Sequence, residues 1–233
     1  ILQQDSNATM QLEACAKLGM VMLLGEVASK ATVSYEQVIR ETIKAVGYDN
    51  EDKGLDWRTM NVIVALEDRT PDLVSNSKDQ QAVLVGYASD ETPELMPLTQ
   101  QLASAMAAEM DQLRKDGTLQ WLHPDAELQV TVHYDVDGES QAMIPRGVSS
   151  VSIVYGHLPE LRPVDPEKEL LEKVVKVVIP SQWLSASTNY LFTIRERKSG
   201  SRVAGVSGRR TVEMYGGWVA CGTSAVGRDM MNL

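Results

Sequence analysis

Residues 10–28 read Met-Gln-Leu-Glu-Ala-Cys-Ala-Lys-Leu-Gly-Met-Val-Met-Leu-Leu-Gly-Glu-Val-Ala and begin the pattern that decides the fold. Two apolar runs, 10–18 and 20–28, flank Gly19, which predicts two strands joined by a tight turn. Residues 34–46 follow with apolar residues at helical spacing, and residues 61–66 form a short apolar strand candidate. The order is therefore hairpin, helix, strand.

The same order returns in the second half of the chain. Residues 128–134 and 148–155 alternate between apolar and polar, with Asp137-Gly138 in the connection between them. A helix is expected from Pro166 to the residue before Pro180, followed by a strand over 189–194. Between the two units, residues 95–115 form the longest helix candidate. The repetition predicts two copies of one small unit.

The fold class predicted from this order is α+β, with antiparallel sheets whose helices cover one face. The expected domains are residues 1–88 for the first repeat and 89–198 for the second. Residues 199–233 are expected to hold a basic, glycine-rich segment and the remnant of a third repeat.

Composition narrows the class of protein. The 233 residues are 43% hydrophobic and 23% charged, as in globular proteins, and no apolar run is long enough to span a bilayer. A net charge of −10 argues against general binding to nucleic acids or anionic membranes. Two widely separated cysteines suggest a reducing compartment. A cytoplasmic location, or an organelle such as the mitochondrion after removal of a leader before Ile1, is expected.

One segment stands out against the acidic background, because six cations fall between residues 195 and 210: Arg195, Arg197, Lys198, Arg202, Arg209 and Arg210. Arginines interleaved with glycines can bind phosphate or carboxylate, so an anion site is one interpretation. A solvated basic loop is the alternative. The three histidines are dispersed and predict no metal site.

Several strings resemble S-adenosylmethionine synthases. The most specific is Asp116-Gly-Thr-Leu-Gln-Trp-Leu-His-Pro-Asp125. Others, in the family's order, are Lys17–Glu26, Val46-Gly-Tyr-Asp49, Gly86–Thr92, Gln129–Val132, Ser207-Gly-Arg-Arg210, Tyr215-Gly-Gly-Trp218 and Gly227-Arg-Asp229. The resemblance covers nearly the whole chain.

The resemblance implies three similar α/β repeats, of which the third is largely missing here. It also implies pairing of subunits through the flat sheet faces and active sites shared between subunits. The family joins methionine to ATP and hydrolyses the released triphosphate with Mg²⁺ and K⁺. Such chemistry needs cations and metal ions at the triphosphate and a fixed orientation of methionine.

Some family residues are retained. The resemblance gives Glu13 as a K⁺-site residue, Glu26 as a methionine contact and Asp125 as an aspartate near the ribose. Four further remnants of the ligand site match the family's phosphate-binding and following segments: Arg209, Arg210, Arg228 and Asp229. Each carboxylate also has a plainer interpretation, as a solvent-side charge on a strand or as part of a turn.

Other family residues are replaced or absent. No family start motif, with its phosphate-binding His and metal-ligating Asp, follows Ile1, and a glycine-rich loop is shortened to residues 200–210. The internal replacements are Arg69 for Gln, Gln80 for Asp, Glu127 for Lys, Arg210 and Arg228 for Lys, and Cys221 for His. Each lost electrostatic contact typically costs a few kcal/mol of transition-state stabilisation.

The sequence therefore predicts a non-catalytic subunit, a pseudoenzyme with a structural or regulatory role in a protein assembly. The partner is expected on a sheet face, with apolar partner-facing surface in residues 10–27 and 128–155. No cofactor is expected, and ATP or triphosphate is expected to bind weakly or not at all. Two alternatives remain open: a divergent methionine adenosyltransferase that uses Mg²⁺ and K⁺ with segments or a partner outside this chain, and a non-catalytic sensor of ATP or S-adenosylmethionine.

Overall fold

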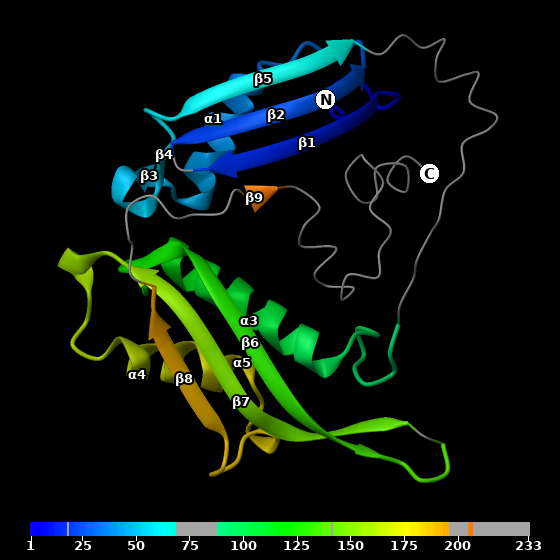
Figure 1. Cartoon of the computed structure of the whole chain (residues 1–233), viewed down its shortest axis with the longest axis vertical. Coiled ribbons are helices and arrows are strands. Elements are labelled where there is room, and N and C mark those ends of the chain that lie inside the picture. Colours follow the sequence, from blue (N-terminus) through cyan, green and yellow to red (C-terminus); the bar gives the residue numbers. More distant parts are fainter. Residues whose placement is uncertain (18, 69–87, 141, 196–204, 207–233) are drawn as a thin grey trace. The chain divides into compact units, whose positions relative to one another are not determined.

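The computed structural model describes residues 1–17, 19–68, 88–140, 142–195 and 205–206. The chain divides into two compact units, one of residues 1–86 with 200–233 and the other of residues 87–199. Each has the mixed helix and strand content of an α+β fold (Figure 1).

Unit 1 is built on a sheet with the strand order β5-β2-β1-β9. Strands β1 (Thr9–Lys17) and β2 (Met20–Ala28) form an antiparallel hairpin, and β5 (Asn61–Asp68) lies parallel to β2. The turn uses Gly19 at φ 71°, a left-handed conformation that favours glycine. The two-residue strand β9 (Gly205–Val206) pairs antiparallel with β1, which the sequence pattern did not indicate.

Helix α1 (Tyr35–Val46) connects β2 to the later strands and ends as predicted at Gly47. Gly47 lies at φ 98°, and Tyr48 N–H donates to Ile43 O, which satisfies carbonyls at the helix end. Between Gly47 and β5 lie β3 (Asp49–Asn50), a 3₁₀ turn (Glu51–Lys53) and β4 (Leu55–Asp56). The small core consists of three buried residues, with partly buried side chains from α1 and β5 against them: Val21, Leu55, Met60, Ile39, Ile43, Tyr48 and Val62.

Unit 2 repeats the chain path with a longer hairpin. Strands β6 (Leu122–Val136) and β7 (Met143–His157) form an antiparallel hairpin, and β8 (Asn189–Ile194) lies parallel to β7. Helix α3 (Leu98–Lys115) precedes the hairpin and begins three residues later than predicted, since Leu95 is left-handed and Pro97 is the N-cap.

The crossover from β7 to β8 is helical. It consists of a 3₁₀ turn (Pro159–Leu161), α4 (Pro166–Leu170), a π-helical stretch (Leu171–Val175), α5 (Lys176–Val178) and a second 3₁₀ turn (Ser181–Trp183). The side chain of Asp165 accepts a hydrogen bond from Lys168 N–H and caps the first turn. The helix predicted here therefore forms, with a π-helical middle.

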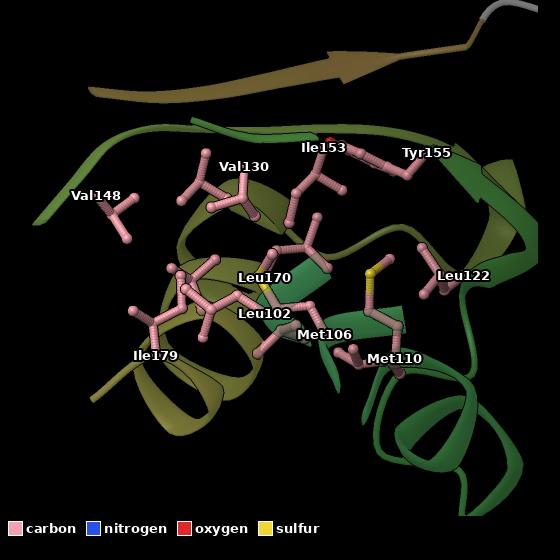
Figure 2. Close-up of a cluster of buried hydrophobic side chains, with 14 of the residues drawn as sticks. Leu102, Met106, Met110, Leu122, Val130, Val148, Ile153, Tyr155, Leu170 and Ile179 are labelled. Atoms are coloured by element: carbon pink, nitrogen blue, oxygen red, sulfur yellow. The ribbon is translucent and has the colours of Figure 1, made fainter. Parts of the chain in front are cut away.

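The core of unit 2 lies between the sheet and these helices (Figure 2). Val130 and Ile153 project from β6 and β7 toward Met106 of α3 and Leu170 of α4, and Val151 of β7 belongs to the same buried cluster. Val130 is 9% exposed, and the other four side chains are 0% exposed. Among the described residues, no helix is both long and apolar enough to cross a membrane.

Candidate functional site

Glu13 and Glu26 lie on one face of the unit 1 sheet. Val21 of β2 and its neighbour Val62 of β5 pack against α1 on one face of the sheet. Successive side chains of a strand point to opposite faces, so Glu26, five residues after Val21, lies on the other face, which we call the outer face. Glu13 pairs with Leu24 across the hairpin, which places it on the same outer face and diagonal to Glu26. The structure therefore brings these two predicted site residues together.

The outer face around them is partly apolar. Leu24 is 37% exposed and Ile63 is 42% exposed, and Met22 lies beside Ile63 in the parallel register. We call this set, Met22, Leu24 and Ile63, the outer apolar strip. It runs directly beside Glu13 and Glu26.

The corresponding face of unit 2 is different. The register places hydroxyl and amide side chains next to one another across β6, β7 and β8: Gln129, Thr131, Ser150, Ser152, Asn189 and Thr193. Most apolar positions of these strands face α3 and α4, but Leu191 lies on the outer face beside Ser152 and is 56% exposed. An apolar, partner-facing surface in residues 128–155 therefore stays a prediction: the outer side chains named above are polar, but Met143 and Ile144 of the same hairpin are 59% and 40% exposed.

Asp125 lies in a bulge of β6. Leu122 pairs with His157 and Ala126 with Tyr155, so residues 123–125 together oppose the single residue Gly156. His123 is 4% exposed and fills the space above Gly156, where an added Cβ would lie 2.8 Å from its Nδ1. The specific string that ends in His-Pro-Asp thus forms a bulge with His123 packed closely on the opposing strand.

Asp125 is paired with a cation of its own chain. Arg195 Nη1 lies 3.1 Å from Asp125 Oδ2, and the other terminal nitrogen contacts the carboxylate of Glu127. On its other side, Asp125 Oδ1 lies 3.9 Å from His123 Nδ1. One guanidinium thus bridges two carboxylates of β6, and the three charges sum to −1.

This pairing changes the interpretation of two sequence features. Of the six cations of the basic segment, Arg195 is the one within the described residues, and it serves Asp125 and Glu127 instead of facing solvent. Glu127, which reverses the charge of the family lysine, has a partner within unit 2. The structure therefore gives Glu127 a local role, and the local charge does not favour a phosphate.

The remaining predicted site residues lie outside the described residues. These are Arg209, Arg210, Arg228 and Asp229, together with the replacements at Arg69, Gln80 and Cys221. Their roles stay predictions.

A metal site at Glu13 would need further carboxylate, imidazole or thiolate ligands close to it. Across the parts of the chain that the structure describes, no three His, Cys, Asp or Glu side chains converge in a way that could hold a metal ion. Among these residues, Glu13 is therefore not part of a set of three such side chains.

Two hollows occur near other features of the described residues. An open groove of about 470 Å³ follows the polar side of α1 beside Trp57, where Lys44 Nζ lies 4.8 Å from the centre of the indole ring. A cavity of about 90 Å³ lies between α3 and β6, with Asp111, Arg114 and His123 among its lining residues. Neither hollow is lined by Glu13, Glu26 or Asp125.

Sequence reasoning did not find the partner of Asp125. Arg195 is 70 positions away in the chain, and no local pattern connects the two. The one sequence feature that pointed to such a partner was the unexpected acid at Glu127. Two neighbouring carboxylates on one strand repel each other unless a cation lies close to both.

Comparison with protein-family models gives two matches. Residues 1–71 match the S-adenosylmethionine synthetase N-terminal domain, and residues 75–197 match the S-adenosylmethionine synthetase central domain. The two matches fall on the two repeats found in the structure, and the central-domain model alone matches more than half of the chain. The chain belongs to the S-adenosylmethionine synthetase family.

Proposed function

We propose that this chain is a non-catalytic, S-adenosylmethionine synthetase-like subunit that acts in a protein assembly through the outer face of the unit 1 sheet. The observation that carries the proposal is the outer apolar strip, which α1 leaves uncovered on the far side of the sheet. An exposed apolar strip on a sheet favours association with another protein surface. The partner is a second copy of this chain or a related subunit.

The absence of catalysis in this proposal is supported by the charges around Asp125. A triphosphate leaving group needs cations, yet the arginine beside Asp125 is shared by two carboxylates. The reversed charge at Glu127 adds repulsion where an anion would approach. Loss of several such contacts together would leave no useful rate, and ATP or triphosphate would bind weakly.

A second candidate function is methionine adenosyltransferase activity that depends on segments or a partner outside this chain. Glu13 and Glu26 favour it, because they lie together on the outer face, next to the proposed contact surface. A subunit docked on this strip would bring its own residues to these carboxylates. Mg²⁺ and K⁺ would then be needed, and further ligands would have to come from the partner.

The association is tested by two substitutions on the strip. The double variant Leu24→Lys with Ile63→Lys is expected to reduce the particle mass in light scattering, because two buried charges in an interface oppose association. Leu191→Lys is the matched control, since Leu191 is 56% exposed on the polar outer face of unit 2. A wild-type chain that is a monodisperse monomer at micromolar concentration would contradict the assembly role.

The two candidate functions are separated by an assay on the same preparation. The chain is incubated with ATP, methionine, Mg²⁺ and K⁺, and S-adenosylmethionine is measured by chromatography. No product is expected from the chain alone. Multiple turnovers per chain would contradict the pseudoenzyme proposal and support methionine adenosyltransferase activity instead.

A further inference from the structure

The outer edge of β6 in unit 2 corresponds to an edge that is covered in unit 1. In unit 1, β9 pairs antiparallel with β1, the first strand of the hairpin, on the side away from β2 (Figure 1). Strand β6 is the first strand of the unit 2 hairpin, and none of the strands that the structure describes lies on its other side. The comparison of the two units therefore indicates room for one more strand beside β6.

This edge is regular, whereas the paired strand β7 is irregular. Within residues 126–136 of β6, both shifts in register insert the extra residue into β7, at Ser149 and at Arg146. Pro145, next to the second bulge, also lacks a backbone N–H. Bulges and prolines are devices that keep a strand from pairing with another chain. Residues 126–136 of β6 contain neither, so this part of the edge can accept a strand.

A cavity lies along the same strand. Its volume is about 90 Å³, and its apolar lining comes from α3 and β6: Ala107, Met110, Leu122, Pro124, Ala126 and Leu128. The polar lining residues Asp111 and Arg114 form an ion pair with each other, at 2.6 Å. No residue of β7 is among the lining residues that the structure describes, so the cavity lies away from β7. A space of this size takes a small aliphatic side chain.

We propose that β6 pairs edge to edge with β6 of a second copy of this chain, antiparallel and with Val132 on the two-fold axis. In this register, Leu128 lies opposite Val136 of the second copy, and Val130 lies opposite Tyr134. Apolar and aromatic side chains thus meet on the face that packs against the helices. The pairing joins two three-stranded sheets into one.

The outer-face side chains favour the same register. Gln129 lies opposite Asp135, and Thr131 lies opposite His133, so groups that can donate face groups that can accept. A shift that centres the pairing on Thr131 would place Glu127 opposite Asp135, and like charges directly opposite each other are destabilising. A shift that centres it on His133 would shorten the paired segment. The register around Val132 therefore combines the longer overlap with matched charges.

The proposed contact buries a side chain that the single chain exposes. Val136 is 59% exposed at the end of β6. In the paired sheet it lies beside Leu128 of the second copy, which lines the cavity. The neighbouring Tyr134 is already held in place, because its Oη donates to Glu91 at 2.6 Å. Burial of Val136 in both copies favours association. This contact lies in unit 2 and does not depend on the outer apolar strip of unit 1.

The test uses the full chain with Leu24→Lys and Ile63→Lys, which removes any contribution of the outer apolar strip. Light scattering at micromolar concentration is expected to give the mass of a dimer. Adding Val136→Lys is expected to weaken dimerisation roughly tenfold or more, because its charge is brought against apolar side chains. Met143→Lys is the matched control, since Met143 pairs with Val136 and is also 59% exposed, but lies in β7. It is expected to leave the dimer unchanged.

A disulfide tests the register directly. In a chain with Cys15→Ala and Cys221→Ala, the pair Thr131→Cys with His133→Cys is expected to give a covalent dimer on oxidation. The two positions lie directly opposite each other across the axis, where Cβ atoms come within reach of a disulfide. Gln129→Cys with His133→Cys is the control pair, since these positions are opposite only if Thr131 lies on the axis. Electrophoresis without reducing agent measures the linked fraction.

The proposal is overturned if the Leu24→Lys, Ile63→Lys variant is a monomer, or if Val136→Lys and Met143→Lys weaken the dimer equally. It is also overturned if the control cysteine pair links as well as the test pair. A mass that falls to that of a monomer with Leu24→Lys and Ile63→Lys would reject edge pairing and retain the outer apolar strip. A dimer that these two changes leave intact and Val136→Lys dissociates would support edge pairing and count against the strip.

Discussion

In their described residues, units 1 and 2 follow the same chain path and differ in how many apolar side chains they bury. In each, an antiparallel hairpin is followed by a helical crossover to a third strand, parallel to the second strand of the hairpin. Yet the described core of unit 1 has three buried residues, and that of unit 2 has sixteen. The same path can therefore carry very different stabilities.

The difference lies in the helices. Helix α1 has no fully buried residue, and Val64 on the helix-facing side of β5 remains 40% exposed. In unit 2, α3 and α4 both cover the sheet, and Met106 and Leu170 are 0% exposed. In unit 1, hydrogen bonds also hold the helix in place: the guanidinium of Arg40 in α1 donates to the backbone carbonyls of Trp57 and Met60. A second covering helix, more than longer strands, makes the larger core.

The largest expected effect comes from equal truncations in the two cores. Leu170→Ala is expected to destabilise unit 2 by about 3–5 kcal/mol, because its fixed neighbours would leave a cavity. Leu55→Ala, at 7% exposure in unit 1, is expected to cost only about 2 kcal/mol, because its half-exposed neighbours can collapse into the space. Hydrogen exchange during urea titration assigns each loss to its unit. Equal losses would remove the proposed difference between the cores.

A medium effect is expected at Gly156 of β7. Gly156→Ala would place a methyl group 2.8 Å from His123 Nδ1, so the imidazole must move, at a cost of about 1–3 kcal/mol. Gly147→Ala, in the same strand, meets only Trp183 O at 3.5 Å, an ordinary contact. Thermal unfolding of both variants checks this. If the two melting temperatures fall equally, the bulge does not depend on the close packing of His123.

Much of this fold was predictable because local rules decide it. Gly19 forms the predicted turn of the first hairpin and Gly47 ends α1 as predicted, both in left-handed conformations. Strand β8 has the predicted bounds of 189–194. The predicted strands of the second hairpin were too short. Pro124 suggested a turn, but a bulge absorbs it and β6 starts at Leu122. Helix α3 was predicted too long at its start, where Leu95 leaves helical geometry.

The site was predictable only where strand alternation decides it. Placing Glu13 and Glu26 on one face follows from the hairpin register around Gly19. The contact between Arg195 and Asp125 depends on β8 returning beside β7, which no local sequence rule states. The basic segment of the sequence therefore did not reveal the partners of Arg195, since Asp125 lies 70 positions earlier in the chain.

The smallest expected effect on the free energy of unfolding concerns two carboxylates that accept hydrogen bonds from loop residues, Glu91 in unit 2 and Asp5 in unit 1. Glu91 accepts hydrogen bonds from Tyr134 Oη at 2.6 Å, Ser89 Oγ at 2.9 Å and Leu98 N–H at 3.2 Å. Burial alone would raise the pKa of Glu91, but these donors outweigh it and hold the pKa below the ordinary value of a glutamate. The pKa of Asp5 also lies below the ordinary value of an aspartate, chiefly because Lys30 N–H and Ser29 Oγ donate to it.

When the pKa of a carboxylate is lower in the folded than in the unfolded state, the unfolded chain binds more protons. The stabilisation from that carboxylate is therefore complete above its unfolded-state pKa and is lost as pH falls through its folded-state pKa. Glu91→Gln is therefore expected to cost about 1 kcal/mol at neutral pH and to approach the wild type as pH falls through the lowered pKa of Glu91. Asp5→Asn, on an exposed loop, should show a smaller difference, which fades as pH falls through the lowered pKa of Asp5. Calorimetry from neutral to acid pH measures both, with Tyr134→Phe removing one donor to Glu91 as an intermediate. Parallel pH profiles for wild type and Glu91→Gln would show that the Glu91 charge does not brace the start of α3. A larger effect at Asp5 than at Glu91 would show that loop bracing, unlike core burial, is stronger in unit 1.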